Sequence, residues 1–284
     1  MASARGHFVW HELLTSDVKG AIGFYGKVAG WTTQGWGENQ GYIMFMAGKS
    51  AMGGVLPIPA DAQRRGEPRH WLPYVGTEDV EVAVWEAQRL GGKVIRDTET
   101  MPSAGKFAVL EDPWGAVFAV IQPENQPSPK YPAVLGDFSW HELVTKDTTN
   151  AFRFYSALFG WQKTEAMDMG PDGVYQEFGW KGRTIGGMYK ETKPGAGPRW
   201  VTYIKVRDAR ASAEVAKKAG GQIRHTLEVP GGDWISGGLD PQGAEFALHS
   251  ATKKAAKKKP AAKKRPAKKP AKRKVTKVKK AKRK

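Results

Sequence analysis

The sequence repeats itself at a spacing of 130 residues, and this repeat limits the possible folds more than any other feature. Both copies open with a Trp-His-Glu-Leu segment, at residues 10–13 and 140–143. Landmarks later in each copy recur at spacings of 129 and 128 residues, namely Trp71 with Trp200, Gly91-Gly92 with Gly220-Gly221, and Asp112-Pro113 with Asp240-Pro241. The body of the chain is therefore two copies of one unit, with small insertions or deletions in loops.

Each copy divides again into two units with the same order of elements. In the first unit, residues 8–14 form a strand pattern, and Val18, Ile22, Tyr25 and Ala29 form the stripe of an amphipathic helix. That helix is predicted to begin at Ser16 or Asp17, to end at Gly30, and to precede strands at 31–36, 42–47 and 51–58. The second unit repeats this order, with a strand at 71–75, a helix at 79–90, and strands near 94, at 107–110 and at 117–121.

The sequence therefore predicts an α+β fold of four βαβββ units with a turn at Asp112-Pro113-Trp114-Gly115. A doubly wound sheet is disfavoured because strands and helices do not alternate regularly. We expect one domain at residues 1–125, a linker at 126–136, a second domain at 137–250 and a disordered tail at 251–284.

The charge of the chain is concentrated in that tail. The whole chain has 45 Lys and Arg against 28 Asp and Glu, but residues 251–284 hold 19 of the basic residues and no acidic one. Lys, Ala and Pro dominate the tail, so it cannot bury a core and is predicted to be disordered. Its basic clusters predict a polyanionic partner, with nucleic acid favoured and contacts to phosphates rather than bases. The residues predicted to bind nucleic acid are Lys257, Lys258, Lys259, Lys263, Lys264, Arg265, Lys272, Arg273 and Lys274.

Other readings of the tail remain open at this stage: an anionic membrane surface, a polyphosphate-like polymer, or a merely solvated extension. The absence of Cys excludes disulfides and thiolate chemistry, and it fits a reducing compartment. No apolar run has the length of a signal peptide or a membrane span. We therefore expect a cytoplasmic protein that associates with the nucleoid through its tail.

The pattern of Asp17, Phe24-Tyr25 and Gly30-Trp31, with the Asp-Pro-x-Gly turn, resembles the vicinal oxygen chelate superfamily. This superfamily contains glyoxalase I, bleomycin-resistance proteins and extradiol dioxygenases, and the resemblance covers residues 7–122 and 137–249. Within the superfamily, the sequence is most similar to two-domain bacterial glyoxalase-like proteins. Its basic tail resembles the tails of linker histones. The resemblance implies that paired units form half-barrels with a ligand on the concave face, and that the tandem domains substitute for a homodimer.

Metalloenzymes of this superfamily place metal ligands on the first strand of each unit and near the end of a fourth strand. In this sequence those positions are held by residues without a metal-binding group: Trp10, Leu72, Ala119, Trp140, Val201 and Ala247. The resemblance therefore implies half-barrels with no metal and no cofactor.

Candidate ligand-binding residues lie on the first strand of each unit. Glu12 and Glu142 share a strand face with Trp10 and Trp140. A carboxylate beside an indole is poorly solvated, which suits a general base or an acceptor for a ligand, although a structural role is equally open. The two tryptophans are predicted to stack on a flat ligand, whereas Trp31, Trp71, Trp161 and Trp200 are predicted to fill the core.

Two further pairs are candidate ligand-binding residues. Tyr74 and Tyr203 are predicted on the same face as the glutamates, as hydroxyl donors or as packing. His11 and His141 are predicted on the opposite face under a helix, and a one-residue change of register would turn them toward the ligand.

Three functions are compatible with this pattern. The favoured one is a tandem protein that binds a small, planar or carbonyl-bearing molecule without a metal and is tethered to nucleic acid by its tail. The second is an enzyme of the same fold, either a lyase or isomerase acting on 2-oxoaldehyde adducts or an oxygenase, with Glu12 and Glu142 as bases and His11 or His141 as ligands. The third is a chromosome-associated scaffold in which the tail is the functional part.

Overall fold

The computed structural model of the chain describes residues 4–37, 39–64, 66–124, 132–191 and 197–252. The first half contains two βαβββ units joined by a short helix. Its elements, in chain order, are β1 (Phe8–Thr15), α1 (Val18–Ala29), β2 (Thr32–Trp36), β3 (Asn39–Ala47), β4 (Ser50–Pro57), α2 (Ala60–Arg64), β5 (His70–Gly76), α3 (Val80–Arg89), β6 (Lys93–Met101), β7 (Gly105–Glu111) and β8 (Val117–Pro123).

The second half repeats this order without the counterpart of α2. Its elements are β9 (Phe138–Thr145), α4 (Thr148–Phe159), β10 (Gln162–Asp168), the 3-10 turn η1 (Gly170–Asp172), β11 (Val174–Trp180), β12 (Arg183–Lys190), β13 (Arg199–Lys205), α5 (Ala209–Lys218), β14 (Gln222–Glu228), β15 (Trp234–Leu239) and β16 (Glu245–Ser250). The predicted α+β class with four βαβββ units is confirmed. The sequence did not predict α2 or η1.

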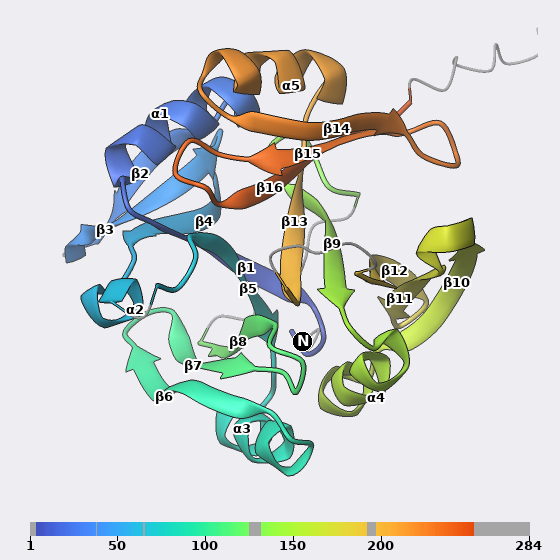
Figure 1. The fold of residues 1–284 in the computed structure, drawn as a ribbon. Coiled ribbons are helices and arrows are strands. Elements are labelled where there is room, and N and C mark those ends of the chain that lie inside the picture. The colour runs from blue at the N-terminus through green and yellow to red at the C-terminus, as the bar shows by residue number, and fades with distance from the viewer. Residues whose placement is uncertain (1–3, 38, 65, 125–131, 192–196, 253–284) are drawn as a thin grey trace, which may run out of the picture. The chain divides into compact units, whose positions relative to one another are not determined.

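Each half forms one eight-stranded sheet. The strand orders are β2-β3-β4-β1-β5-β8-β7-β6 and β10-β11-β12-β9-β13-β16-β15-β14. Figure 1 shows the first strands of paired units side by side at the centre of each sheet, β1 with β5 and β9 with β13. These central pairs are antiparallel, whereas β1 with β4 and β5 with β8 are parallel. Each sheet is therefore two units joined about an approximate two-fold axis.

The helices begin and end where capping chemistry places them. The Asp17 side chain accepts a hydrogen bond from the Gly20 backbone N–H at 2.9 Å, which satisfies a free donor in the first turn of α1. At the other end Gly30 has a φ of 72°, the left-handed conformation that ends helices with little strain in glycine. Asp147 and Gly160 cap α4 in the same way, and the predicted limits of the first helix are confirmed.

Two large apolar cores lie between the halves, and each core takes residues from both. One core joins α1 and its strands to residues of the last unit, such as Phe246 and Leu248. The other joins α3 and its strands to the unit that contains Phe154 and Trp161. In agreement, α1 packs against α5 and α3 packs against α4. Because both of these large cores take residues from both halves, the residues as far as Thr252 form one compact unit.

The predicted core tryptophans and the predicted turn are both confirmed. Trp31, Trp71, Trp161 and Trp200 are each at most 6% exposed. Asp112 accepts hydrogen bonds at 2.9 Å from the backbone N–H groups of the turn between β7 and β8. Its second oxygen accepts one from the Tyr155 hydroxyl at 2.9 Å, so this turn also connects the halves. Tyr25 donates to Asp240 at 3.2 Å in the related position.

Within the described residues, no helix has the length and apolar character needed to cross a bilayer. Seven residues of the segment around the predicted linker, 125–131, lie outside the described residues, so the boundaries predicted for the linker stay a prediction.

Candidate functional site

The central strands of the first sheet place an acid between two tyrosines. Trp10 lies opposite Tyr74 and Glu12 lies opposite Leu72, so these four side chains share one face of the sheet, called the Glu12 face below. The Tyr74 hydroxyl donates to Glu12 Oε2 at 2.6 Å, and the Tyr42 hydroxyl donates to Glu12 Oε1 at 2.7 Å. The Trp10 indole N–H donates in turn to the Tyr42 hydroxyl at 2.8 Å. One tryptophan and two tyrosines thus hold the carboxylate.

The second sheet repeats this network on the face that carries Glu142, called the Glu142 face. Tyr175 and Tyr203 donate to the two oxygens of Glu142 at 2.8 and 2.9 Å. The Trp140 indole N–H donates to the Tyr175 hydroxyl at 2.8 Å. The sequence correctly predicted that Trp10, Glu12 and Tyr74 share a face, and likewise their counterparts.

Burial controls the protonation of both networks. It raises the pKa of Glu12 and of Glu142, and the hydrogen bonds from the tyrosines oppose that rise only in part. Burial and the neighbouring carboxylate together raise the pKa of Tyr42 and Tyr74, so these hydroxyls stay protonated and act as donors. Each carboxylate oxygen receives one hydrogen bond and keeps a further lone pair. The arrangement can therefore accept a hydrogen bond from a ligand or hold a proton.

The positions at which the superfamily binds metal do not fit an ion in this chain. Leu72 and Ala119 pack with Trp10 in one apolar cluster beside Glu12. Val201 and Ala247 pack with Trp140 in the matching cluster. None of these side chains has a free electron pair for a divalent ion, and the indole N–H groups donate hydrogen bonds to tyrosine. In the part of the chain that the structure describes, no group of three His, Asp or Glu side chains is arranged to hold a metal.

His11 and His141 lie on the opposite faces of the two sheets, where the halves meet. Their Nε2 atoms are 2.7 Å apart, the His11 ring stacks on Phe138 and the His141 ring stacks on Phe8. Burial lowers the pKa of both imidazoles, to about 3 for His141, so both are neutral at pH 7. The predicted strand parity is thus confirmed, but the covering element is the other half of the chain and not a helix. Their role in ligand binding stays a prediction.

The sequence analysis missed Tyr42 and Tyr175, although a signal for them exists. They recur at a spacing of 133 residues, as does the Gly53-Gly54 pair with Gly186-Gly187. A Cβ atom on Gly54 would lie 2.2 Å from the Tyr42 hydroxyl, and one on Gly187 would lie 2.3 Å from that of Tyr175. Because Gly54 and Gly187 have no side chain, each tyrosine ring can lie over the strand that separates it from the glutamate.

The charged surroundings of the two glutamates differ. On the Glu12 face, Arg96 lies over the Phe107 ring at 5.0 Å and pairs with the exposed Glu99. In the second sheet, Arg199 pairs with both Glu191 and Glu245, and these three side chains are about four-fifths buried. The two faces thus share a network but present different polar groups around it.

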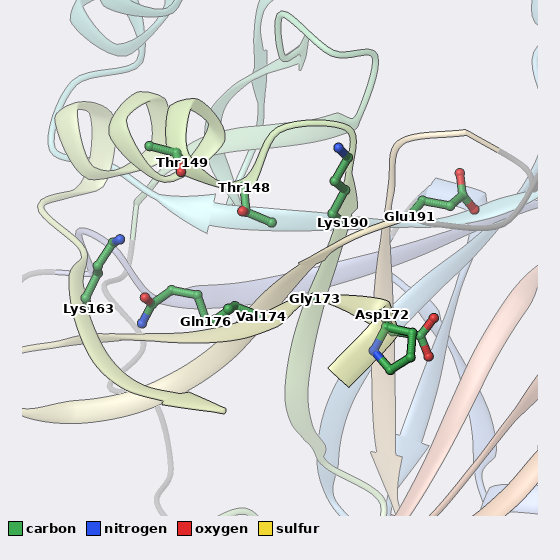
Figure 2. Close-up of a pocket in the computed structure, with 10 residues that line it drawn as sticks. Thr148, Thr149, Lys163, Asp172, Gly173, Val174, Gln176, Lys190 and Glu191 are labelled. Carbon is green, nitrogen blue, oxygen red and sulfur yellow. The ribbon is translucent and has the colours of Figure 1, made fainter. Parts of the chain in front are cut away.

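A surface hollow of about 770 Å³ lies on the helix side of the second sheet, away from the Glu142 face. Figure 2 shows Thr148 and Thr149 of α4 on one side of it, and Lys163, Gln176 and Lys190 of the strands around it. Lys163 lies 5.3 Å from the ring of Phe152 in α4, which places it on the helix side. None of the residues predicted from the sequence lines this hollow.

The predicted nucleic-acid-binding residues, from Lys257 to Lys274, lie outside the described residues, as does the rest of the chain after Thr252. Their role stays a prediction.

Comparison with known proteins agrees with the fold and with the duplication. Residues 10–121 match the family described as Glyoxalase-like domain, and residues 137–248 match the family described as Glyoxalase/Bleomycin resistance protein/Dioxygenase superfamily. The chain is 28% identical over 246 residues to CFP32 of Mycobacterium tuberculosis, which is named as a glyoxylase; the match covers 84% of this chain and 92% of that protein. It is also 28% identical over 260 residues to the anthracycline biosynthesis protein DnrV of Streptomyces peucetius, covering 86% and 93% of the two chains.

Among solved structures, the fold is similar to the 2,3-dioxygenase LapB from Pseudomonas sp. KL28, with a TM-score of 0.59 and 12% identity over 87% of this chain and 91% of that one. It is also similar to a Mn(II)-bound glyoxalase from Novosphingobium aromaticivorans, with a TM-score of 0.57 and 13% identity over 87% and 82% of the chains.

Proposed function

The chain carries two domains of the glyoxalase superfamily in tandem, and from this premise we propose that each sheet binds a small, planar organic molecule on its glutamate face without a metal. One observation supports this proposal above the others. Each sheet holds a glutamate between two tyrosines, buried at Glu12 and half-buried at Glu142, beside a half-buried tryptophan that stands where the superfamily resemblance predicts an ion ligand. This is the composition of an apolar ligand site with a few fixed polar groups.

The chemistry of the face indicates the kind of ligand. An indole and the rings of Tyr74 and Phe107 favour contact with a flat, apolar molecule. The carboxylate accepts hydrogen bonds, so the ligand should carry a hydroxyl or N–H donor at its edge. A relative named for anthracycline biosynthesis agrees with a fused-ring compound that carries hydroxyl groups.

A titration of the full chain with 1,2-dihydroxyanthraquinone tests this proposal, with binding followed by quenching of tryptophan fluorescence. We expect Glu12→Gln and Glu142→Gln each to remove one class of site, because an amide presents one acceptor oxygen in place of two. Glu214→Gln on the exposed side of α5 is the matched control and should bind as the parent protein does. Unchanged binding by the double variant Glu12→Gln/Glu142→Gln would contradict the proposal.

Catalysis by the same glutamates is a second candidate, because burial raises their pKa toward the range in which a carboxyl group exchanges protons with a substrate. The reaction would be a lyase or isomerase step on a 2-oxoaldehyde adduct, or an oxygenation. The test is turnover of the hemithioacetal of methylglyoxal and glutathione. Catalysis predicts that the two Glu→Gln variants still bind the adduct but lose turnover, whereas simple binding predicts no turnover in any form.

For the tail we propose sequence-independent binding to nucleic acid, with the chromosome-associated scaffold as the alternative role of the whole protein. The support is its charge of 19 basic residues without an acidic one. Removal of residues 253–284 should abolish binding to duplex DNA, and binding by the intact chain should weaken steeply as salt rises. Affinity that survives the truncation would contradict this proposal. If the intact chain and the truncated chain bind dihydroxyanthraquinone equally well, ligand binding by the sheets is independent of nucleic-acid binding by the tail.

A further inference from the structure

A groove of about 680 Å³ lies between the two sheets, and it is lined by His11 and His141, whose side chains point away from the glutamate faces. Its walls come from matching positions of the halves: Phe8 with Phe138, and His11 with His141. The stacked rings at its base, Phe8 on His141 and His11 on Phe138, give it an aromatic floor. Most of its polar side chains come from the second half, among them Ser139, Lys205 and His249, and Ser50 of the first half also lines it.

Ser139, His249 and Asp233 form a continuous hydrogen-bonded series at one wall of this groove. The Ser139 Oγ lies 2.9 Å from His249 Nδ1, and His249 Nε2 lies 3.0 Å from Asp233 Oδ2. Ser139 and His249 line the groove, and Asp233 lies behind the imidazole. The order is a hydroxyl, a base and a carboxylate that orients the base, each within hydrogen-bond reach of the next.

The contacts of Asp233 fix the direction of these hydrogen bonds. Burial opposes the ionisation of Asp233, but the Thr252 backbone N–H at 2.8 Å and His249 outweigh it and lower its pKa. An ionised carboxylate only accepts hydrogen bonds, so a neutral His249 carries its proton on Nε2. Its Nδ1 then has a lone pair directed at Ser139, and this nitrogen, at 2.9 Å, is a closer acceptor for the serine hydroxyl than the Tyr203 backbone oxygen at 3.3 Å. This is the protonation state in which imidazole can take a proton from serine.

Duplication does not account for this series, because the first half lacks every member of it. The positions that match Ser139, His249 and Asp233 hold Val9, Ile121 and Gly105. Ser139 is the extra residue at an irregularity in the pairing of β9 with β13, and Val9 is the extra residue at the matching irregularity of β1 with β5, so the bulge is shared and only the second half places a hydroxyl on it. Such bulges turn a side chain away from the regular alternation of the strand and are common beside active sites.

We propose that Ser139, His249 and Asp233 form a nucleophilic triad that hydrolyses carboxylic esters of flat aromatic acids or alcohols held in the groove. Ser139 Oγ attacks the ester carbonyl while His249 Nδ1 takes the hydroxyl proton, and Asp233 stabilises the imidazolium that results. The carbon–oxygen bond to the alcohol then breaks, and the alcohol leaves with the proton from His249. Water, deprotonated by the same nitrogen, hydrolyses the acyl ester of Ser139 to release the acid and restore the serine.

The groove also contains a cation for the charge that develops on the ester oxygen. Lys205 lines it on the side of His249, and its ammonium group donates to the Ala133 backbone oxygen at 2.8 Å. In the first half the matching residue is Gly76. The cation, like the triad, is therefore specific to the second half.

Labelling with a fluorophosphonate and hydrolysis of 4-nitrophenyl benzoate test this proposal in the full chain. We expect one phosphonylated serine per chain, at Ser139, with loss of fluoride, and ester hydrolysis above the rate of buffer alone. Ser139→Ala should abolish both, and His249→Gln should lower both by about 100-fold or more, since it removes the base. Asp233→Asn should lower the rate while leaving the ester's binding unchanged.

Ser156→Ala is the matched control, because this serine donates to the Trp161 backbone oxygen at 2.7 Å instead of to an imidazole. It should keep full labelling and full hydrolysis. Thermal unfolding of each variant shows whether it is folded. A folded Ser139→Ala protein that is labelled or hydrolyses ester as fast as the parent protein would overturn the proposal, and so would a parent protein that is not labelled at Ser139.

Discussion

The Glu12 and Glu142 faces share four side chains in the same geometry, but the residues around those side chains differ. In both, a tryptophan donates to a tyrosine, and two tyrosines donate to the glutamate at 2.6 to 2.9 Å. Around Glu12 the neighbours are mainly apolar, and its nearby cation, Arg96, is half exposed. Near Glu142, Arg199 forms ion pairs with two carboxylates, Glu191 and Glu245.

This difference separates two roles within one site. The shared network determines how the glutamate is held, because a buried carboxylate without donors is costly in either sheet. The residues that differ around each glutamate determine which ligand the face prefers. The first sheet should favour apolar ring systems, and the second should favour ligands with more polar groups. The predictions below test whether the networks are equivalent and whether the surroundings are not.

The largest effect is expected where the two sheets meet, at the pair of His11 and His141. The folded protein keeps both imidazoles neutral, whereas in the unfolded chain they titrate near pH 6.5. Below pH 6.5 the unfolded state therefore binds protons that the folded state does not, and stability falls as pH falls. His141, whose pKa falls to about 3, should contribute a slope of about 1.4 kcal/mol per pH unit between pH 6 and pH 4, and His11 should add a contribution in the same direction.

Urea unfolding of the double variant His11→Leu/His141→Leu at several pH values measures this slope. The variant should lose the contribution of the pair and keep only what other groups contribute. Unfolding at pH 7.5, where both histidines are neutral in either state, is the internal control for packing. An unchanged slope would mean that the pair is not the origin of the acid sensitivity.

The next effect tests whether the two networks are equivalent. Gly54→Ala and Gly187→Ala each place a methyl group against a tyrosine hydroxyl, so the ring must move and one oxygen of the glutamate loses its donor. We expect each variant to be destabilised by about 2 to 4 kcal/mol. Gly23→Ala in α1 meets no atom within 4 Å and should leave stability equal or slightly higher. Very different losses of stability in Gly54→Ala and Gly187→Ala would contradict the equivalence of the two networks.

A smaller effect tests whether the surroundings differ. Arg199→Met leaves Glu191 and Glu245 without their shared cation in a mostly buried place, and should cost about 1 to 3 kcal/mol. Arg96→Met removes an exposed pair and should cost less than about 0.5 kcal/mol. Thermal unfolding at low and high salt compares them. Equal losses would show that the two arginines have the same structural role.

The sequence could predict the elements of this fold because its evidence for them is local. The caps at Asp17 and Gly30, the strand parity of Trp10 and Glu12, and the turn at Asp112 all depend on residues within a few positions of one another. The repeat then extended each assignment to the second half. Local pattern and duplication together were sufficient for the α+β class and for one side of each network.

The rest of the site depends on contacts that no local pattern specifies. Tyr42 reaches Glu12 from a strand 30 residues away, and its partner in the repeat follows a different spacing because of loop insertions. The contact of His11 with His141 crosses the whole repeat. The Ser139 series joins residues 110 and 16 positions apart and exists in one copy only, so a search for duplicated residues could not find it.

The smallest effect is expected at the outer end of each network, where Trp10 and Trp140 donate to tyrosine at the same distance of 2.8 Å. Phenylalanine in place of either tryptophan keeps an aromatic surface but removes the donor, and should cost about 1 kcal/mol of stability. Because the tyrosine still donates to glutamate, its position should change little, and the loss should be equal in the two sheets. Urea unfolding of Trp10→Phe and Trp140→Phe measures both losses. If the tryptophans instead serve mainly as walls for a ligand, the two variants should differ in affinity for dihydroxyanthraquinone while their stabilities stay alike, since only the surroundings of the networks distinguish the sheets.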